Sequence, residues 1–248
     1  METQEEINNA FYDDLKDKWY AADDHPIALL RAENASRTPW VIDQIKNHFS
    51  FSSCKVLDIG CGAGFLANAL AEQGHCVTGI DSSFESLEVA KRKDGTKSAT
   101  YLEGDAYRLP FSQGEFDVVC AMDFLEHVEK PQSVIEQASR VLKPGGLFFF
   151  HTFNRNPLSW LVVLKGVEWF VKNTPKNMHV YRLFLKPAEL KTLCAQSSLE
   201  VVTFQGLVPD IQKKAFWQML VTRRVSNAFS FRLTSSLSCG YMGIARKL

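Results

Sequence analysis

The chain has 248 residues, 46% of them hydrophobic, with equal numbers of acidic and basic residues, which is ample material for a folded core. No run of 18 uncharged apolar residues occurs, which excludes a membrane-spanning helix. The first residues are acidic and polar, unlike a signal or transit peptide, and the six cysteines show no metal-binding spacing. We therefore expect a cytoplasmic protein with reduced thiols.

The balanced net charge conceals an asymmetry along the chain. Residues 1–150 carry ten more acidic than basic residues, and residues 151–248 carry ten more basic than acidic ones. A basic half rich in aromatic residues favours contact with an anionic membrane or a nucleic acid. Charge complementarity between two halves of one domain would account for the same distribution.

The predicted elements alternate between strands and helices along most of the chain. The first 50 residues are expected to form a helical cap, with Ile7, Phe11 and Leu15 on one face and a second helix over 38–49. Strands are expected at 56–59, 76–80, 100–102, 116–122, 147–153, 199–205 and 241–247, and helices at 65–73, 82–93, 131–142 and from Pro187. The helix over 131–142 is expected to stop at a breaker, residues 143–146.

The alternation of elements predicts the fold class. A helical insertion is expected over about 154–186, where the alternation lapses. The remainder predicts a single α/β domain over 1–248, with a seven-stranded, mostly parallel, Rossmann-like sheet and helices on both faces.

The most informative stretch is 56–81, which contains a buried strand, a glycine loop, a helix, a second strand and then an acid. In a doubly wound sheet, a ligand lies across the carboxyl ends of such strands. Gly60, Gly62 and Gly64 allow the backbone to approach a ligand closely. Asp81, at the end of the second strand, can accept both hydroxyls of a ribose.

The spacing of the glycines distinguishes between classes of ligand. A dinucleotide loop has the pattern G-x-G-x-x-G, whereas this loop reads G-x-G-x-G with Asp58 two residues ahead of it. A carboxylate there would repel a pyrophosphate but suits a ligand with an ammonium group, such as S-adenosylmethionine (SAM). The stretch resembles motif I of the class I SAM-dependent methyltransferases. A tight turn without a ligand is the alternative.

Further residues are expected beside the same ligand. Ser82 follows Asp81 directly and is also a candidate helix cap. Asp105, after the third strand, is placed to accept a hydrogen bond from the adenine amine, although it can equally cap a turn. Met122 ends the fourth strand and would form an apolar wall near the adenine or sulfonium, or simply belong to the core.

An acidic and imidazole-bearing group follows the fourth strand. Asp123, Glu126 and His127 stand at i, i+3 and i+4, so a helical turn would gather them on one side. Such a group can hold a divalent cation, with Mg²⁺ or Ca²⁺ favoured by the oxygens and Zn²⁺ allowed by the imidazole. Alternatively, Glu126 or His127 acts as a catalytic base. A solvated helix start is the third interpretation.

Several segments beyond motif I resemble the O-methyltransferases of ubiquinone biosynthesis, from about residue 11 to residue 206. The segments are DSSFE (81–85), LEHV (125–128), PQSV (131–134), KPGG (143–146), TFNRNP (152–157), GVEW (166–169) and KPAEL (186–190). The resemblance implies methyl transfer from SAM to a phenolic hydroxyl of a polyprenylated catechol or quinol, and a quinone-biosynthesis complex as a partner.

The resemblance also implies roles for individual residues. SAM contacts fall on Arg37, Gly60, Asp81 and Met122, with Arg37 at the methionine carboxylate, and metal ligands fall on Asp123, Glu126 and His127. Residues 105–111 are similar to C-methylating quinone enzymes as well, so a carbon acceptor or another small molecule stays open. A non-catalytic SAM-binding protein is the remaining alternative.

The basic half contains two candidate membrane-contact segments. Residues 158–172 are mostly apolar, with Lys165, Glu168 and Lys172 forming a charged stripe. A helix of this kind either covers the active site as a lid or enters a bilayer interface, with peripheral contact at the inner face of a membrane. Basic and aromatic residues alternate again near the end, at Lys213, Lys214, Phe216, Trp217, Leu220, Arg223 and Arg224. No nucleic-acid partner is expected, because no recognised binding module occurs.

Overall fold

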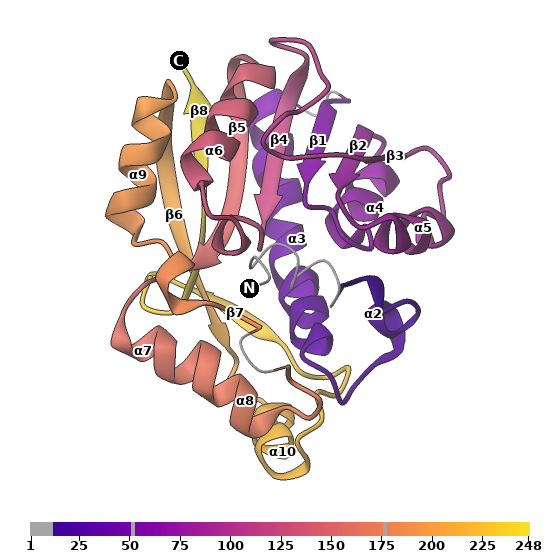
Figure 1. Cartoon of the computed structure of the whole chain (residues 1–248), viewed down its shortest axis with the longest axis vertical. Coiled ribbons are helices and arrows are strands. Elements are labelled where there is room, and N and C mark those ends of the chain that lie inside the picture. The colour runs from indigo at the N-terminus through magenta and orange to yellow at the C-terminus, as the bar shows by residue number, and fades with distance from the viewer. Residues whose placement is uncertain (1–11, 51–52, 176–177) are drawn as a thin grey trace.

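A computed structural model describes residues 12–50, 53–175 and 178–248 (Figure 1). Its centre is an eight-stranded sheet in the order β3-β2-β1-β4-β5-β8-β6-β7. The strands are β1 (Lys55–Ile59), β2 (Cys76–Asp81), β3 (Thr100–Glu103), β4 (Phe116–Met122), β5 (Leu142–Phe153), β6 (Leu199–Pro209), β7 (Phe231–Thr234) and β8 (Gly240–Lys247). Strands β1 to β5 are parallel, whereas β8 runs antiparallel between β5 and β6.

Helices cover both faces of the sheet, as the sequence predicted. One face packs against α3 (Ile27–Phe49), α4 (Phe65–Glu72) and α5 (Phe84–Lys93), and the other against α6 (Pro131–Val141) and α9 (Pro187–Gln196). Alternate residues of β4 point to opposite faces of the sheet. Val118 points to the face covered by α3, α4 and α5, and Val119 to the face covered by α6 and α9. Because both faces are buried, the strand is apolar almost throughout. Each fully buried large aliphatic side chain contributes about 1.5–3 kcal/mol.

A further helical group lies beyond the carboxyl ends of β1 and β4, at the lower end of Figure 1. It contains α7 (Pro157–Ser159), the π-helix η2 (Trp160–Gly166), α8 (Val167–Phe170) and α10 (Lys214–Thr222). These helices share a small core that includes Val171, Met219 and Phe229. The group contains the late helical insertion expected from the sequence. Among the described residues, no helix is long and apolar enough to cross a membrane.

All seven expected strands form, and the sheet contains one strand more. The eighth, β7, pairs antiparallel with β6 at the sheet edge. Residues 143–146 do not separate α6 from the next strand as expected. They belong to β5, where the register against β4 shifts between Phe116 and Val118 and absorbs the extra residues. The six cysteines form no disulfide, and all but Cys76 are buried.

The largest difference at the N-terminal end concerns α3. The helix begins at Ile27 rather than at 38 and contains Pro39. A proline removes one helical hydrogen bond, and we attribute its tolerance to the packing of Val41 and Ile45, which are fully buried against the sheet. The short α2 (Lys18–Ala21) precedes it. Of the expected first helix, Ile7 and Phe11 lie outside the described residues.

Candidate active site

The glycine loop after β1 adopts backbone angles that favour glycine. Gly60, Gly62 and Gly64 have φ values of 66°, 50° and 78°, in the left-handed region that side chains disfavour. A Cβ on Gly60 would lie 2.1 Å from the Phe124 ring. Gly60 and Gly62 line a cavity of about 490 Å³. Gly64 does not line it; this residue caps the start of α4 and packs against Tyr101.

This cavity, named here the polar cavity, collects acidic side chains from the ends of β1, β2 and β4. Asp81 accepts hydrogen bonds from the backbone N–H groups of Gly62 (2.8 Å) and Ser83 (2.9 Å). Burial raises the pKa of Asp58 to about 7, although the nearby Arg37 opposes the shift. Eight of the nine predicted cofactor-binding residues line the polar cavity: Arg37, Asp58, Gly60, Gly62, Asp81, Ser82, Asp105 and Met122.

Two further residues of the polar cavity, Asp105 and Met122, agree with both of the interpretations that the sequence allowed. Asp105 is exposed and accepts a hydrogen bond from the Tyr107 backbone N–H at 2.8 Å, so it caps a turn and also faces the cavity. Met122 belongs to the buried core and lines the cavity as well. Tyr12 and Trp19, which the sequence did not suggest, stack at 5.5 Å and complete the wall.

A buried ion pair closes the inner end of the polar cavity. Both terminal nitrogens of Arg37, on α3, donate to the two oxygens of Asp123, which follows β4. His151, on β5, contacts the same carboxylate through Nδ1. Burial disfavours the charge of Asp123, but Arg37 and His151 outweigh burial and hold the pKa of Asp123 well below its usual range. In this arrangement both terminal nitrogens of Arg37 are bonded to Asp123.

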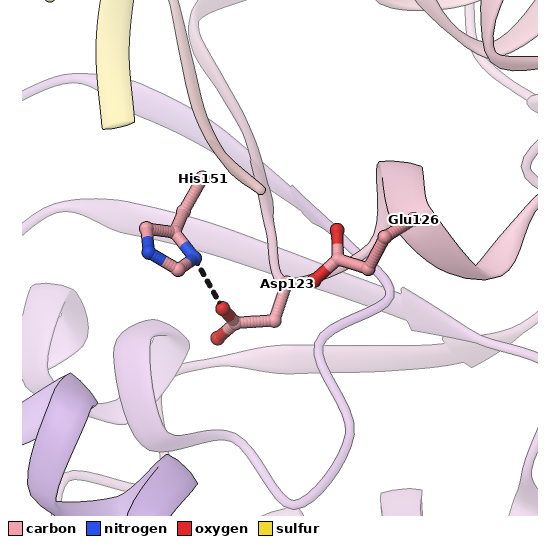
Figure 2. Close-up of side chains that lie close together, drawn as sticks. All are labelled: Asp123, Glu126 and His151. Atoms are coloured by element: carbon pink, nitrogen blue, oxygen red, sulfur yellow. Dashed lines mark hydrogen bonds and ion pairs between the residues drawn. The ribbon is translucent and has the colours of Figure 1, made fainter. Parts of the chain in front are cut away.

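Glu126 lies on the other side of Asp123, and Figure 2 shows it with Asp123 and His151. Neither of its carboxylate oxygens has a hydrogen-bond partner among the described residues. Burial, followed by the negative charge of Asp123, raises its pKa well above the usual range; Thr152 opposes the shift without reaching hydrogen-bond geometry. Burial therefore favours the protonated form of Glu126, which lines neither of the two cavities of the site.

The cation site predicted on Asp123, Glu126 and His127 does not assemble in that form. Within the described part of the chain, the potential ligands that gather are Asp123, Glu126 and His151, with one atom from each within 4.8 Å of the others. Both oxygens of Asp123 are bonded to Arg37 and His151. A guanidinium at this place repels a cation. The residues as arranged here do not fit a divalent cation.

His127 takes a different position from Glu126. It ends the 3-10 turn η1 (Leu125–His127), and its ring meets the ring of Tyr12 edge-on at 6.2 Å. Burial lowers the pKa of His127 to about 4, although Asp123 opposes the shift. The imidazole is therefore neutral at pH 7 and can accept a proton. His127 lines the polar cavity and also a second one.

The second cavity, named here the apolar cavity, has a volume of about 460 Å³. Its walls come from α3, the helical segment 157–170, α10 and β7, and include Val163, Val167, Phe170 and Met219. It shares Tyr12, Leu30, Asp123 and His127 with the polar cavity. The two cavities therefore meet beside His127.

Comparison with known proteins agrees with this architecture. Residues 57–150 match the family model described as "Methyltransferase domain". A SAM-dependent methyltransferase from Thermotoga maritima superposes with a TM-score of 0.66 at 17% identity, covering 96% of this chain and 99% of that one. Magnesium protoporphyrin IX methyltransferase from Synechocystis, with bound SAM, gives 0.63 at 15% identity, covering 100% and 99%. The fold is that of class I SAM-dependent methyltransferases.

A closer similarity in sequence accompanies the shared fold. The chain is 42% identical over 156 aligned residues to the ubiquinone biosynthesis O-methyltransferase of Escherichia coli. The aligned stretch covers 62% of this chain and 65% of the length of that relative. The resemblance predicted from the sequence motifs is confirmed.

Four residues of the site were missed by the sequence analysis. They belong to no motif and are Tyr12, Trp19, His151 and His179. The sequence nevertheless indicated that His151 could belong to the site. It is a polar residue near the carboxyl end of the apolar strand β5, and β5 pairs with β4 at Met122, one residue before Asp123.

Proposed function

We propose that this protein is a SAM-dependent O-methyltransferase whose acceptor is a phenolic hydroxyl on a lipid-tailed ring. The observation that carries the proposal is the meeting of the polar and apolar cavities at His127. A transferase needs its two reactants in contact at one point, and alignment of the reacting atoms supplies much of the rate. The similarity to the ubiquinone biosynthesis enzyme of Escherichia coli supports the same reaction.

The polar cavity fits SAM through two carboxylates. Asp81 is held in place by the N–H groups of Gly62 and Ser83, and a carboxylate retains capacity to accept ribose hydroxyls as well. Asp58, buried at the end of β1, suits the ammonium of the methionine part, which would favour its charged form. SAM, when bound, supplies an electrophilic methyl group, which passes to the acceptor oxygen as its bond to sulfur breaks.

The acceptor needs a base, because a free phenol has a pKa near 10. His127 is unprotonated at pH 7, lines both cavities and is the group best placed to take the phenolic proton. Its lowered pKa makes it a weak base, so a nearby negative charge must assist it. Asp123, charged and held by Arg37, lies beside it and would stabilise the imidazolium that forms. Glu126 lines neither cavity, and burial favours its protonated form, so it is less suited to accept a proton.

The apolar cavity supports a lipid-tailed acceptor over a small soluble one. Its walls are aliphatic and aromatic, and its polar side chains include those shared with the polar cavity. A hydrocarbon tail gains about 25 cal/mol for each Å² of apolar surface removed from water. A carbon acceptor stays a second candidate, because the cavity accommodates any prenylated ring.

Peripheral membrane contact is part of the proposal. The segment 157–170 and α10 line the apolar cavity on the inside and expose large apolar side chains on the outside. Trp169 and Trp217 are 55% and 57% exposed. The exposed basic side chains nearby in sequence include Lys172, Lys213, Lys214 and Arg223. Exposed apolar and basic groups on and beside these helices suit an anionic bilayer interface, from which a lipid-tailed phenol would enter.

Vesicle sedimentation tests this contact. Replacing Trp169 and Trp217 together with Ser should lower binding to phosphatidylglycerol-containing vesicles at least fivefold, because two interfacial anchors are lost. Val202→Ser removes a similarly exposed apolar residue from β6 and serves as the control. Equal loss in the control, or none in the double variant, contradicts membrane contact through these helices.

A direct assay tests the activity. The purified protein is incubated with SAM and either a prenylated catechol, the same ring without its tail, or a prenylated ring with only a carbon nucleophile. We expect an O-methyl product by mass spectrometry, with the tail-bearing catechol preferred. C-methylation would favour the second candidate. Tight SAM binding without transfer to any acceptor would indicate a non-catalytic SAM-binding protein.

A further inference from the structure

Glu33 is a buried carboxyl group that the proposed reaction does not use. It lies inside α3, is 8% exposed and lines the apolar cavity. Leu29 and Leu30, one turn earlier on the same helix, line the cavity as well, so the carboxyl group emerges from an apolar stripe of α3. A glutamate is almost never buried to this extent unless it is paired.

No partner within the protein accounts for the burial of Glu33. Among the described residues, its carboxyl group takes part in no hydrogen bond and no ion pair. Arg37, one turn further along α3, donates both terminal nitrogens to Asp123 instead. A methionine would fill a similar space without burying a polar group, so packing alone does not explain a carboxyl group here.

The charge of the apolar cavity indicates which kind of ligand Glu33 suits. The described residues that line the cavity include two with carboxyl groups, Glu33 and Asp123, and neither a lysine nor an arginine. Arg37 and His151 already hold the carboxylate of Asp123. Glu33 is therefore the carboxyl group of this cavity that is left for a ligand, and a positively charged group is the partner that a carboxylate favours.

The rest of the cavity suits a hydrocarbon chain. Its walls are mainly aliphatic and aromatic, with Val163, Phe170 and Met219 among them. Its volume of about 460 Å³ lies within the range of roughly 300–1,000 Å³ that is typical of small-molecule sites. A ligand that matches both the walls and Glu33 combines an apolar chain with one positive charge.

We propose that the apolar cavity binds lipophilic amines, with the alkyl chain against its walls and the ammonium group donating to the carboxylate of Glu33. An ammonium group has three N–H donors and no acceptor, so it supplies the positive charge and the hydrogen bond that Glu33 lacks. The site depends on the charge of the cavity and not on methyl transfer. A bound amine and a lipid-tailed acceptor would nevertheless compete for the same space.

Calorimetry with three ligands of equal chain length tests the site. Octylammonium, octanol and octanoate are titrated into the protein at pH 8.5, because burial raises the pKa of Glu33 to about 8 and an alkylammonium is still charged there. We expect octylammonium to bind about tenfold more tightly than octanol, the size of one hydrogen bond to a charged group. Octanoate should bind most weakly, because its carboxylate would meet an acidic wall.

Substitutions locate the preference. Glu33→Gln keeps the shape of the side chain and removes its charge, so the preference for octylammonium over octanol should fall to about twofold or less. Glu72→Gln removes a charge from an exposed position of α4 and is the matched control, which should keep the full preference. Val163→Phe adds volume to the cavity wall and should weaken octylammonium and octanol alike.

The comparison of ligands in the wild-type protein requires no variant to fold. Equal affinity for octylammonium and octanol there overturns the inference, and so does a folded Glu33→Gln protein that keeps the preference. Loss of the preference in Glu72→Gln as well would assign it to the overall charge of the surface, and unchanged affinities in Val163→Phe would place the binding outside the cavity. Each of these two results also overturns the inference. A protein that transfers no methyl group can still show the expected binding, so failure of the proposed function is distinguishable.

Discussion

The polar and apolar cavities meet at the same side chains but are held together in different ways. In the polar cavity, the backbone N–H groups of Gly62 and Ser83 fix Asp81. Arg37 donates through two nitrogens to Asp123. The apolar cavity has mainly side-chain packing, between the helical segment 157–170 and α10. Backbone hydrogen bonds tolerate little rearrangement, whereas packed aliphatic side chains can be exchanged at similar volume.

This difference indicates which cavity can change the specificity for the methyl acceptor. A methyl donor that many enzymes share requires a rigid cavity that stays the same. A methyl acceptor that varies between enzymes requires cavity walls whose shape can change by substitution. Changes in the polar cavity should therefore affect every acceptor alike. Changes in the apolar cavity should separate tail-bearing acceptors from tail-less ones.

The largest effect is expected where the two cavities meet. His127→Phe keeps the ring contact with Tyr12 but removes the proposed base, so kcat should fall by about 10²–10⁴-fold for all acceptors. SAM affinity by calorimetry should stay within severalfold. Glu126→Gln keeps the shape of a protonated carboxyl group and should lose much less. An equal loss in both variants would mean that the Glu126 carboxylate takes part in the reaction.

The next effect concerns the polar cavity alone. Asp81→Ala removes the proposed ribose acceptor and the restraint on Gly62, so affinity for S-adenosylhomocysteine should fall about 100-fold by calorimetry. Asp94→Ala is the matched control, because Asp94 also accepts from backbone N–H groups, those of Thr96 and Ala99, at the far end of α5. Similar losses in both would assign the effect to general destabilisation.

A smaller effect concerns the pH dependence of donor binding. Because burial raises the pKa of Asp58 to about 7, this carboxyl is mostly protonated at pH 6 and mostly charged at pH 8. An ammonium ligand favours the charged form, so affinity for S-adenosylhomocysteine should rise about tenfold from pH 6 to pH 8 and then level off.

Asp58→Asn separates this group from others that titrate nearby. Glu33, on α3, is one of them, since burial raises its pKa to about 8. The Asn variant should bind weakly and lose most of the pH dependence. A slope that survives the substitution would assign the titration to Glu33 or to the ligand.

The smallest effect should appear in the apolar cavity and only with a tail present. Val163→Phe adds volume to the wall, so kcat/KM for a prenylated catechol should fall about fivefold relative to the tail-less ring. Val202→Phe, on an exposed position of β6, is the control. If both substrates lose equally, the cavity does not hold the tail.

The sequence predicted the polar cavity better than the apolar one, for a physical reason. Residues 56–81 form a strand, a loop, a helix and a second strand in immediate succession, so the ends of adjacent parallel strands bring Asp58, Gly60 and Asp81 together. Local pattern and tertiary position coincide there. Eight of nine predicted residues line that cavity, and Gly64 does not because it starts a helix.

The apolar cavity could not be predicted in the same way. Its walls come from α3, the segment 157–170, α10 and β7, which only tertiary packing brings together. The same limitation affected β7, whose place is set by pairing with β6. At the boundary between the cavities, spacing predicted Asp123, Glu126 and His127 on one side of a helix. A short 3-10 turn and a left-handed backbone at Asp123 separate them instead.

The position of β8 has a consequence for how the protein is made. Residues 240–247 form hydrogen bonds to β5 on one side and to β6 on the other, so a late segment of the chain occupies an interior place in the sheet. During synthesis the edges of β5 and β6 that face β8 stay unpaired until this segment leaves the ribosome, although β5 can already pair with β4 and β6 with β7. A premature stop before residue 240 would leave both strand edges open to aggregation. The two edges that face β8 are therefore exposed in the nascent chain until residues 240–247 have been synthesised.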